Sequence, residues 1–123
     1  MMDNLDMVFL EIKELVDSVT GEDGHDFVCG KFEGLGWLDF HYKCTSYDGQ
    51  YPRIALKRKK DAVHFYVMLW IDGEPALKKY ESLFGKSNVG KGCLRIKKMD
   101  DARENAVREL VMLAMTKNEG GSN

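Results

Sequence analysis

The feature that most constrains this 123-residue chain is the segment from Ala62 to Ile71, which is apolar at nearly every position. In an extended strand, successive side chains point to opposite faces. Both faces of this segment would be largely apolar, with Val63, Phe65, Val67, Leu69 and Ile71 on one and His64, Tyr66, Met68 and Trp70 on the other. The pattern predicts a central strand that is covered on both faces, or a strand whose second face lines a pocket.

Amphipathic helices are predicted before and after this strand in the sequence. Apolar residues recur at helical spacing over residues 4–19, and Thr20-Gly21 supplies a stop. A second helix is predicted over 102–116, with Asp101 and Glu104 forming an acidic version of the capping box. A short helix is expected from Pro75 to Phe84, closed by Gly85.

Further strands are predicted at 37–44, 53–58 and 93–98. The first alternates, with Leu38, Phe40 and Tyr42 on one side and Trp37, Asp39, His41 and Lys43 on the other. A turn is expected at 46–49, where Asp-Gly readily supplies positive φ. A hairpin about 59–61 is expected to join the strand at 53–58 to the apolar strand at 62–71.

This order of elements predicts an α+β fold. We expect a mostly antiparallel sheet of about four strands, with the N-terminal and C-terminal helices and the short middle helix packed on it. No linker divides the chain, so residues 1–116 are expected to form a single domain and 117–123 a flexible tail.

Composition excludes several classes of protein. The chain is 44% hydrophobic and 31% charged, which is typical of a globular domain, and its longest apolar run is far short of the ~20 residues that cross a bilayer. No secretory signal is visible, and three cysteines without Cys-x-x-Cys spacing are expected to be reduced thiols. These features predict a cytoplasmic protein with no membrane partner.

Charge is unevenly distributed along the chain. Residues 1–26 hold eight acids and one base, a balance of −7, whereas the remainder holds 12 acids and 17 bases, a balance of +5. The net charge of −2 does not suggest a dedicated nucleic-acid binder. Such a charge asymmetry affects which partners a protein binds and how soluble it is. Alternatively, the acidic segment lies near basic parts of the same domain.

Three segments carry a resemblance to a known family: residues 51–68, Gly85-Lys-Ser, and the run Gly90-Lys-Gly-Cys-Leu-Arg-Ile-Lys-Lys-Met-Asp-Asp. Together they are similar to the YdhG-like proteins, small bacterial proteins of which some are described as frataxin-like intracellular iron chaperones. The similarity covers roughly residues 35–116. It implies a compact α+β fold, a cytoplasmic location and labile iron as a cofactor, but brings no catalytic residues and no matched iron ligands.

Glu11, Glu14 and Asp17 are the candidate metal ligands. They step along neighbouring exposed positions of the first predicted helix, and carboxylate oxygens suit iron that is held loosely for transfer to an acceptor protein. The alternative interpretation is that these acids form the solvated face that any amphipathic helix needs.

A second candidate site is one face of the sheet. If Asp39, His41 and Lys43 share a face with Arg53, Ala55 and Lys57, aromatic and cationic groups converge there. The predicted ligand-binding residues are His41, Arg53, His64, Tyr66, Trp70 and Arg95. Such a face would take an anionic small molecule or a protein partner. Alternatively, a helix or the second subunit of a homodimer covers it.

No catalytic motif is present, so the chain is expected not to be an enzyme. Gly85 and Gly90-Lys91 match the first part of a phosphate-binding loop, but Gly92 stands where serine or threonine must ligate magnesium. Cys44 or Cys93 could form a nucleophile and base pair with His41 or His64, although no sequence spacing fixes their geometry. Residues 90–98 are therefore interpreted as a turn and core strand.

Overall fold

The computed structural model describes residues 3–29, 32–45, 47–67, 69–90 and 92–120. The elements follow in the order α1 (Asn4–Thr20), β1 (His25–Cys29), β2 (Phe32–Cys44), β3 (Tyr47–Arg58), β4 (Val63–Val67), β5 (Trp70–Ile71), β6 (Glu74–Pro75), the 3-10 helix η1 (Ala76–Tyr80), α2 (Glu81–Phe84), the 3-10 helix η2 (Lys86–Asn88), β7 (Cys93–Ile96) and α3 (Asp101–Gly120). No helix in the described ranges is both long and apolar enough to cross a membrane.

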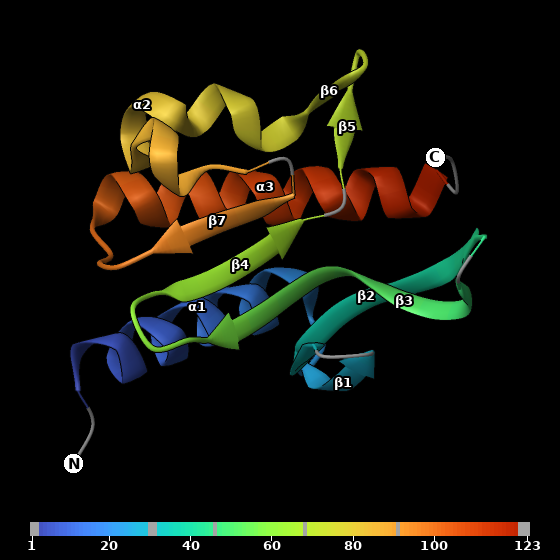
Figure 1. The fold of residues 1–123 in the computed structure, drawn as a ribbon, viewed down its shortest axis with the longest axis horizontal. Helices are drawn as coiled ribbons and strands as arrows, with labels where there is room; N and C mark the ends of the chain where they lie inside the picture. The colour runs from blue at the N-terminus through green and yellow to red at the C-terminus, as the bar shows by residue number, and fades with distance from the viewer. Residues whose placement is uncertain (1–2, 30–31, 46, 68, 91, 121–123) are drawn as a thin grey trace.

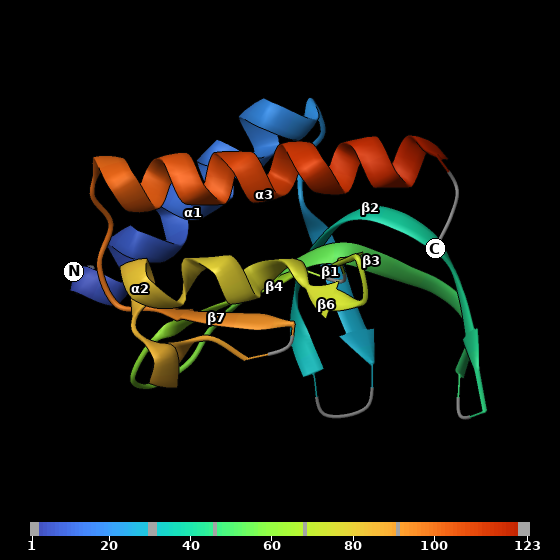
Figure 2. The same cartoon turned by 90° about the horizontal axis from the view of Figure 1, so that it is seen from above.

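The α+β prediction is confirmed. Five strands form an antiparallel sheet in the order β1-β2-β3-β4-β7, and β5 and β6 form a separate two-stranded ribbon. Figures 1 and 2 show α1 and α3 on the same side of the main sheet, with η1 and α2 near the β7 edge. Among the described residues no α-helix covers the opposite side of the sheet, and we call this side the open face.

The core lies between the sheet and the two long helices. Its largest fully buried side chains come from both layers, and they include Trp37, Phe65, Ile54, Leu56, Ile12, Leu77 and Leu110. On β4, Val63, Phe65 and Val67 are buried, whereas His64 and Tyr66 on the open face are partly exposed. The central position predicted for this strand is therefore confirmed, because β3 and β7 flank it.

Both long helices form where their apolar periodicity predicts them. Asp3 caps α1 in a reciprocal capping box with Asp6, and Gly21 ends the helix in the left-handed conformation, at φ 76°. Asp100, rather than Asp101, caps α3, because its carboxylate accepts the backbone N–H of Arg103 at 2.9 Å. The backbone of α3 extends to Gly120, four residues beyond the predicted end, and 121–123 lie outside the described residues.

The predicted turn at 46–49 is wrong for its described part. Cys44 pairs with Tyr47, and Asp48 and Gly49 lie within β3 instead of in a turn. Ser46 itself lies outside the described residues. The register that results pairs His41 with Gln50 and Phe40 with Tyr51. In this register Arg53 lies on the same face as Tyr51 and Phe40, whereas His41 lies on the other face with Gln50, so the predicted sharing of a face by His41 and Arg53 is also wrong.

Leu38 interrupts β2 locally. Its φ is 57°, a conformation that non-glycine residues adopt rarely, and its N–H donates to the Glu22 carboxylate at 3.1 Å instead of continuing the ladder. Beyond Leu38 the paired strands continue as a hairpin arm, residues 39–44 and 47–52, which extends away from the rest of the sheet in Figure 1.

The long strand predicted over 62–71 is shorter in the structure. β4 ends at Val67, Met68 lies outside the described residues, and Trp70 begins β5. Asp72 and Gly73 both take positive φ, which turns the chain back to pair Trp70 with Pro75. Trp70 therefore belongs to the small ribbon and not to the main sheet.

Candidate functional site

Six partly exposed aromatic residues form a connected set on the open face and the hairpin arm. We call them the aromatic row, and they are Phe27, Phe32, Phe40, Tyr42, Tyr51 and Tyr66. Phe27 and Phe32 project from β1 and β2, and Tyr66 projects from the central strand β4. The other three belong to the hairpin arm.

The rings touch one another in an unbroken sequence. Tyr66 meets Phe32 edge to face, with ring centroids 5.2 Å apart, and Phe32 lies 6.1 Å from Phe27. Phe27 meets Tyr51 at 5.3 Å, and Tyr51 lies 5.3 Å from Tyr42. Edge-to-face pairs are favourable because the positive ring edge meets the negative ring face. The row therefore crosses four strands without a gap.

Two glycines on β2 make room for these rings. A Cβ atom added to Gly34 would lie 2.5 Å from the Leu56 carbonyl oxygen and 3.0 Å from the Phe32 ring. At Gly36, an added Cβ atom would lie 2.8 Å from the Cβ of Pro52. Any side chain at either position would collide with its neighbours, so alternate glycines on this strand are a requirement of the face.

Two cationic side chains lie over rings of the aromatic row. The Cζ atom of Arg53 is 4.3 Å from the centroid of Phe40, and the Nζ atom of Lys57 is 5.4 Å from that of Phe32. Such cation–π contacts contribute roughly 0.5–1 kcal/mol when exposed and more when desolvated. Arg53 is only 8% exposed, and this desolvation lowers the pKa of its guanidinium. The face thus combines aromatic surface with one buried cation, Arg53, and one partly exposed cation, Lys57.

A polar cluster adjoins the row at β4 and β7. The Nδ1 atom of His64 lies 3.5 Å from the Tyr66 hydroxyl and 3.6 Å from the Cys93 Sγ. Burial raises the pKa of both the Cys93 thiol and the Tyr66 hydroxyl. Burial, reinforced by Lys59, Arg95 and Lys57, lowers the pKa of His64.

These pKa directions favour the neutral form of all three groups near neutral pH. A nucleophilic cysteine needs the opposite arrangement, a thiolate stabilised beside an imidazolium. The structure therefore brings Cys93 and His64 within hydrogen-bonding distance, but the pKa of each is shifted away from the charged pair. The side chain of Cys44 lies outside the described residues.

The predicted ligand-binding residues divide into two groups. His64 and Arg95 are cross-strand partners on β4 and β7, Tyr66 lies two residues from His64, and Arg53 lies farther along the row. His41 and Trp70 do not join them, which corrects the prediction that all six share one face. The Nε2 atom of His41 lies 2.5 Å from the Asp48 carboxylate, on the opposite side of the hairpin arm from Phe40.

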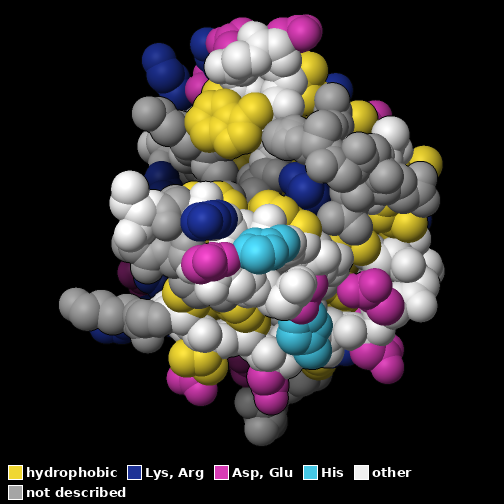
Figure 3. Space-filling model, turned by 90° about the vertical axis from the view of Figure 1, so that its right-hand side faces the viewer, with side chains coloured by type: hydrophobic (Ala, Val, Ile, Leu, Met, Phe, Trp, Pro, Cys, Tyr) yellow, Lys and Arg dark blue, Asp and Glu magenta, His cyan; other side chains and the backbone are white. Residues whose placement is uncertain are grey.

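Two histidine–carboxylate pairs lie on the hairpin arm and the neighbouring strand β1. His25 and Asp39 make a second such pair, at 3.1 Å, which links β1 to the hairpin arm. Figure 3 shows histidine side chains beside acidic ones on this surface. The His25–Asp39 pair joins the arm to β1, and the His41–Asp48 pair lies within the arm, so the histidine that we predicted as a ligand already pairs with a carboxylate.

The predicted metal ligands lie along α1. Glu11 and Glu14 are exposed, whereas Asp17 is partly buried and already engaged. Its Oδ1 atom accepts the Trp37 indole N–H at 2.8 Å and the Gly24 backbone N–H at 2.9 Å, and its Oδ2 atom accepts from Lys13 at 2.7 Å. In the part of the chain that is described, no three histidine, cysteine or acidic side chains form a group that could hold a metal ion.

Comparison with known proteins adds no family to this description. No protein-family model, curated protein or solved structure matches the chain. The resemblance to the YdhG-like proteins therefore stays a prediction.

Sequence reasoning missed most of the aromatic row. It did not predict β1, so Phe27 had no strand to belong to, and Phe32 lay outside the first predicted strand. One signal was present: Phe32, Gly34 and Gly36 occupy alternate positions, which is typical of a strand face where small residues admit rings from neighbouring strands.

Proposed function

We propose that this chain is a non-enzymatic binding module whose open face takes an anionic ligand that carries a flat aromatic ring. The observation that carries the proposal is the aromatic row itself, with Arg53 and Lys57 held over two of its rings. A stacked ligand ring gains roughly 1–3 kcal/mol on such a platform, judged from bases stacked on aromatic side chains. The cations beside it would favour a ligand with negative charge.

The exposure of the aromatic row supports a ligand-binding role for the open face over a purely structural one. All six rings are partly exposed although the chain buries a large separate core on the other side of the sheet. A few placed polar groups beside apolar surface are typical of ligand sites. His64, Tyr66 and Arg95 would supply such groups at the β7 end of the face.

The test uses adenosine 5′-monophosphate and adenosine as probes, followed by NMR of the aromatic side chains. We expect the nucleotide to shift the ring resonances of Phe27, Phe32 and Tyr66 saturably, and adenosine to bind more weakly. Phe32→Ala should weaken binding about tenfold, which corresponds to ~1.4 kcal/mol of lost stacking. Lys57→Gln should weaken the nucleotide more than adenosine, because it removes charge.

Matched variants control for general effects. Met112→Ala removes an exposed apolar side chain on α3, and Lys43→Gln removes a cation on the hairpin arm. Neither should alter binding. The proposal fails if neither probe shifts the rings of the row, or if Phe32→Ala and Met112→Ala behave alike.

A further inference from the structure

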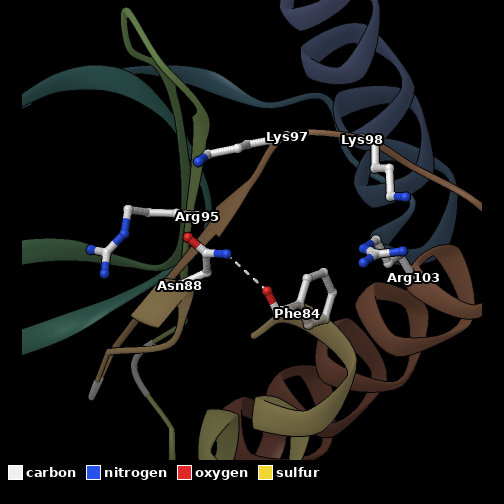
Figure 4. A pocket seen from close by; sticks show the side chains of 6 residues that line it. All are labelled: Phe84, Asn88, Arg95, Lys97, Lys98 and Arg103. Atoms are coloured by element: carbon white, nitrogen blue, oxygen red, sulfur yellow. Dashed lines mark hydrogen bonds between the residues drawn. The ribbon is translucent and has the colours of Figure 1, made fainter. Parts of the chain in front are cut away.

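A second feature lies at the β7 edge of the main sheet, where a cleft of about 200 Å³ opens between three parts of the chain. Its lining residues come from α2 and η2, from β7 and the loop after it, and from the first turn of α3: Phe84, Asn88, Arg95, Lys97, Lys98 and Arg103 (Figure 4). Four of the six are cationic. The cleft is smaller than the roughly 300–1,000 Å³ of pockets for drug-sized ligands, so it fits a small group.

The walls of the cleft are fixed by hydrogen bonds. Arg103 donates to the Asp100 carboxylate at 2.6 Å and to the Leu83 carbonyl at 3.1 Å, and its Cζ atom lies 5.6 Å from the Phe84 ring centroid. The Asn88 amide donates to the Phe84 carbonyl at 2.9 Å. Arg95 donates to the Ser87 carbonyl. These contacts hold both arginines in place before any ligand arrives.

Positive charge in the cleft exceeds the negative charge that faces it. Asp100 pairs with Arg103, but Lys97 and Lys98 are exposed and make no ion pair with any described residue. In Figure 4 the ends of the Lys98 and Arg103 side chains lie near each other beside Phe84, while the Arg95 guanidinium points away from them. Like charges that converge on a cavity repel one another and concentrate anions there.

We infer that this cleft is a binding site for a phosphate group, either free inorganic phosphate or the phosphate of a small phosphomonoester. Lys98 and Arg103 would contact the phosphate oxygens. A guanidinium that is already oriented makes charge-assisted hydrogen bonds to phosphate with little further loss of freedom, and an ammonium adds a mobile point charge. The cleft shares Arg95 with the β7 end of the open face, but the residues that would contact phosphate, Lys98 and Arg103, lie outside the aromatic row. The inference therefore does not depend on the function proposed for that row.

The test is a titration with inorganic phosphate at constant ionic strength, followed by amide NMR, with a second titration using ribose 5-phosphate. We expect saturable shifts at the amides of Phe84, Asn88 and 95–103 with phosphate. Equal or tighter binding of ribose 5-phosphate would assign the site to phosphomonoesters, and weaker binding would assign it to the free ion. Lys98→Gln should weaken binding about tenfold, the effect of one charge-assisted contact.

Controls separate this site from the open face and from nonspecific charge effects. Lys43→Gln removes an equal charge far along the hairpin arm and should leave phosphate binding unchanged, as should Phe32→Ala. Arg103 is a poor target because it also supports α3, so a Lys97→Gln and Lys98→Gln double variant serves as the second test. The inference is overturned if phosphate causes no saturable shift, or if the double variant binds it as tightly as wild type.

Discussion

Asp17 connects three parts of the molecule at a single carboxylate. It joins α1 to the loop before β1 through Gly24, and to β2 through the buried indole of Trp37. Gly24 itself could carry no side chain, since an added Cβ atom would lie 2.5 Å from the Trp37 ring. From the sequence Asp17 is indistinguishable from Glu11 and Glu14, because all three occupy polar positions of one helix. Only the tertiary contacts separate the structural carboxylate from the solvated ones.

Replacing Asp17 should therefore cost stability. We expect Asp17→Ala to lower the free energy of unfolding by roughly 2–3 kcal/mol, because it leaves the indole N–H and a backbone N–H without their acceptor. Urea denaturation measures this change, and Glu11→Gln, a substitution at an exposed position of the same helix, should leave stability nearly unaltered. Equal effects of the two substitutions would contradict the structural role.

The difference in the free energy of unfolding between wild type and Asp17→Ala should depend on pH, and the pKa of Asp17 gives the direction. Burial raises the pKa of Asp17, but the hydrogen bonds from Lys13, Trp37 and Gly24 outweigh it, so the net pKa is lowered. The folded state thus binds a proton less readily than the unfolded state, and the stabilisation is complete above the unfolded value of about 3.9. The gap between wild type and Asp17→Ala should narrow as pH falls below about 4.

The same pair of variants tests the iron hypothesis. If Glu11, Glu14 and Asp17 bind labile iron, anaerobic titration with ferrous ion should show binding above a competing chelator, and Glu11→Gln should weaken it. Because Glu11→Gln is expected to keep the fold intact, a loss of binding in that variant would report on the metal alone. Iron binding, with an acceptor protein as partner, stays a prediction.

At the scale of elements, two glycines that look alike in sequence have different roles. Gly21 ends α1 at φ 76° with open space around its added Cβ atom, so only backbone conformation resists a side chain there. Gly90, in the segment with the family resemblance, lacks positive φ, and its added Cβ atom would sit 3.6 Å from the Cys93 carbonyl, an ordinary contact.

The two positions should respond differently to alanine. Gly21→Ala is expected to destabilise the protein by about 1 kcal/mol, the cost of holding an L residue in the left-handed region. Gly90→Ala should change stability by no more than about 0.5 kcal/mol. Thermal or urea unfolding measures both, and a Gly90→Ala loss as large as that of Gly21→Ala would show that Gly90 has a conformational role.

The β2 strand shows why alternation alone gave the wrong face. Period-two reasoning assumes an unbroken extended strand and a known register. The pairs before and after Leu38 keep one register, in which Trp37 faces the core and Asp39 and His41 lie on the opposite face from Arg53. Because pairing is decided by both strands together, His41 could not be placed from β2 alone.

At the scale of the whole molecule, the two faces of the main sheet have different chemistry. The helix side is filled by aliphatic side chains with Trp37 and Phe65, while the open face carries partly exposed rings and cations. Trp70 is 53% exposed on the small ribbon, away from the aromatic row. A homodimer that covers it stays a prediction, and sedimentation analysis would test it.

The asymmetry between the faces predicts unequal costs for two phenylalanine substitutions. Phe65→Ala should lower the free energy of unfolding by about 3–5 kcal/mol, because it empties a fully buried position on the central strand. Phe32→Ala should cost clearly less, since Phe32 is partly exposed. Urea denaturation of both variants measures the difference, and equal losses would mean that the open face is as much a structural core as the helix side.

The sequence by itself determined the layers of this protein. Apolar periodicity placed α1 and α3, the continuous apolar run identified β4 as central, and Leu94 and Ile96 marked β7 as a core strand. These are local patterns, because burying one face of a helix or strand requires apolar residues at a fixed spacing in the sequence. The α+β class follows from them because amphipathic helices must cover the apolar face of a sheet.

Only the tertiary structure decided which side chains meet. The aromatic row joins residues from β1, β2, β3 and β4, and the cleft at the β7 edge joins residues from α2, η2, β7, the loop after β7 and α3. Such contacts depend on strand register, on the left-handed Leu38 and on where β4 stops. All three are set by packing between distant segments, so no local pattern in the sequence specifies them.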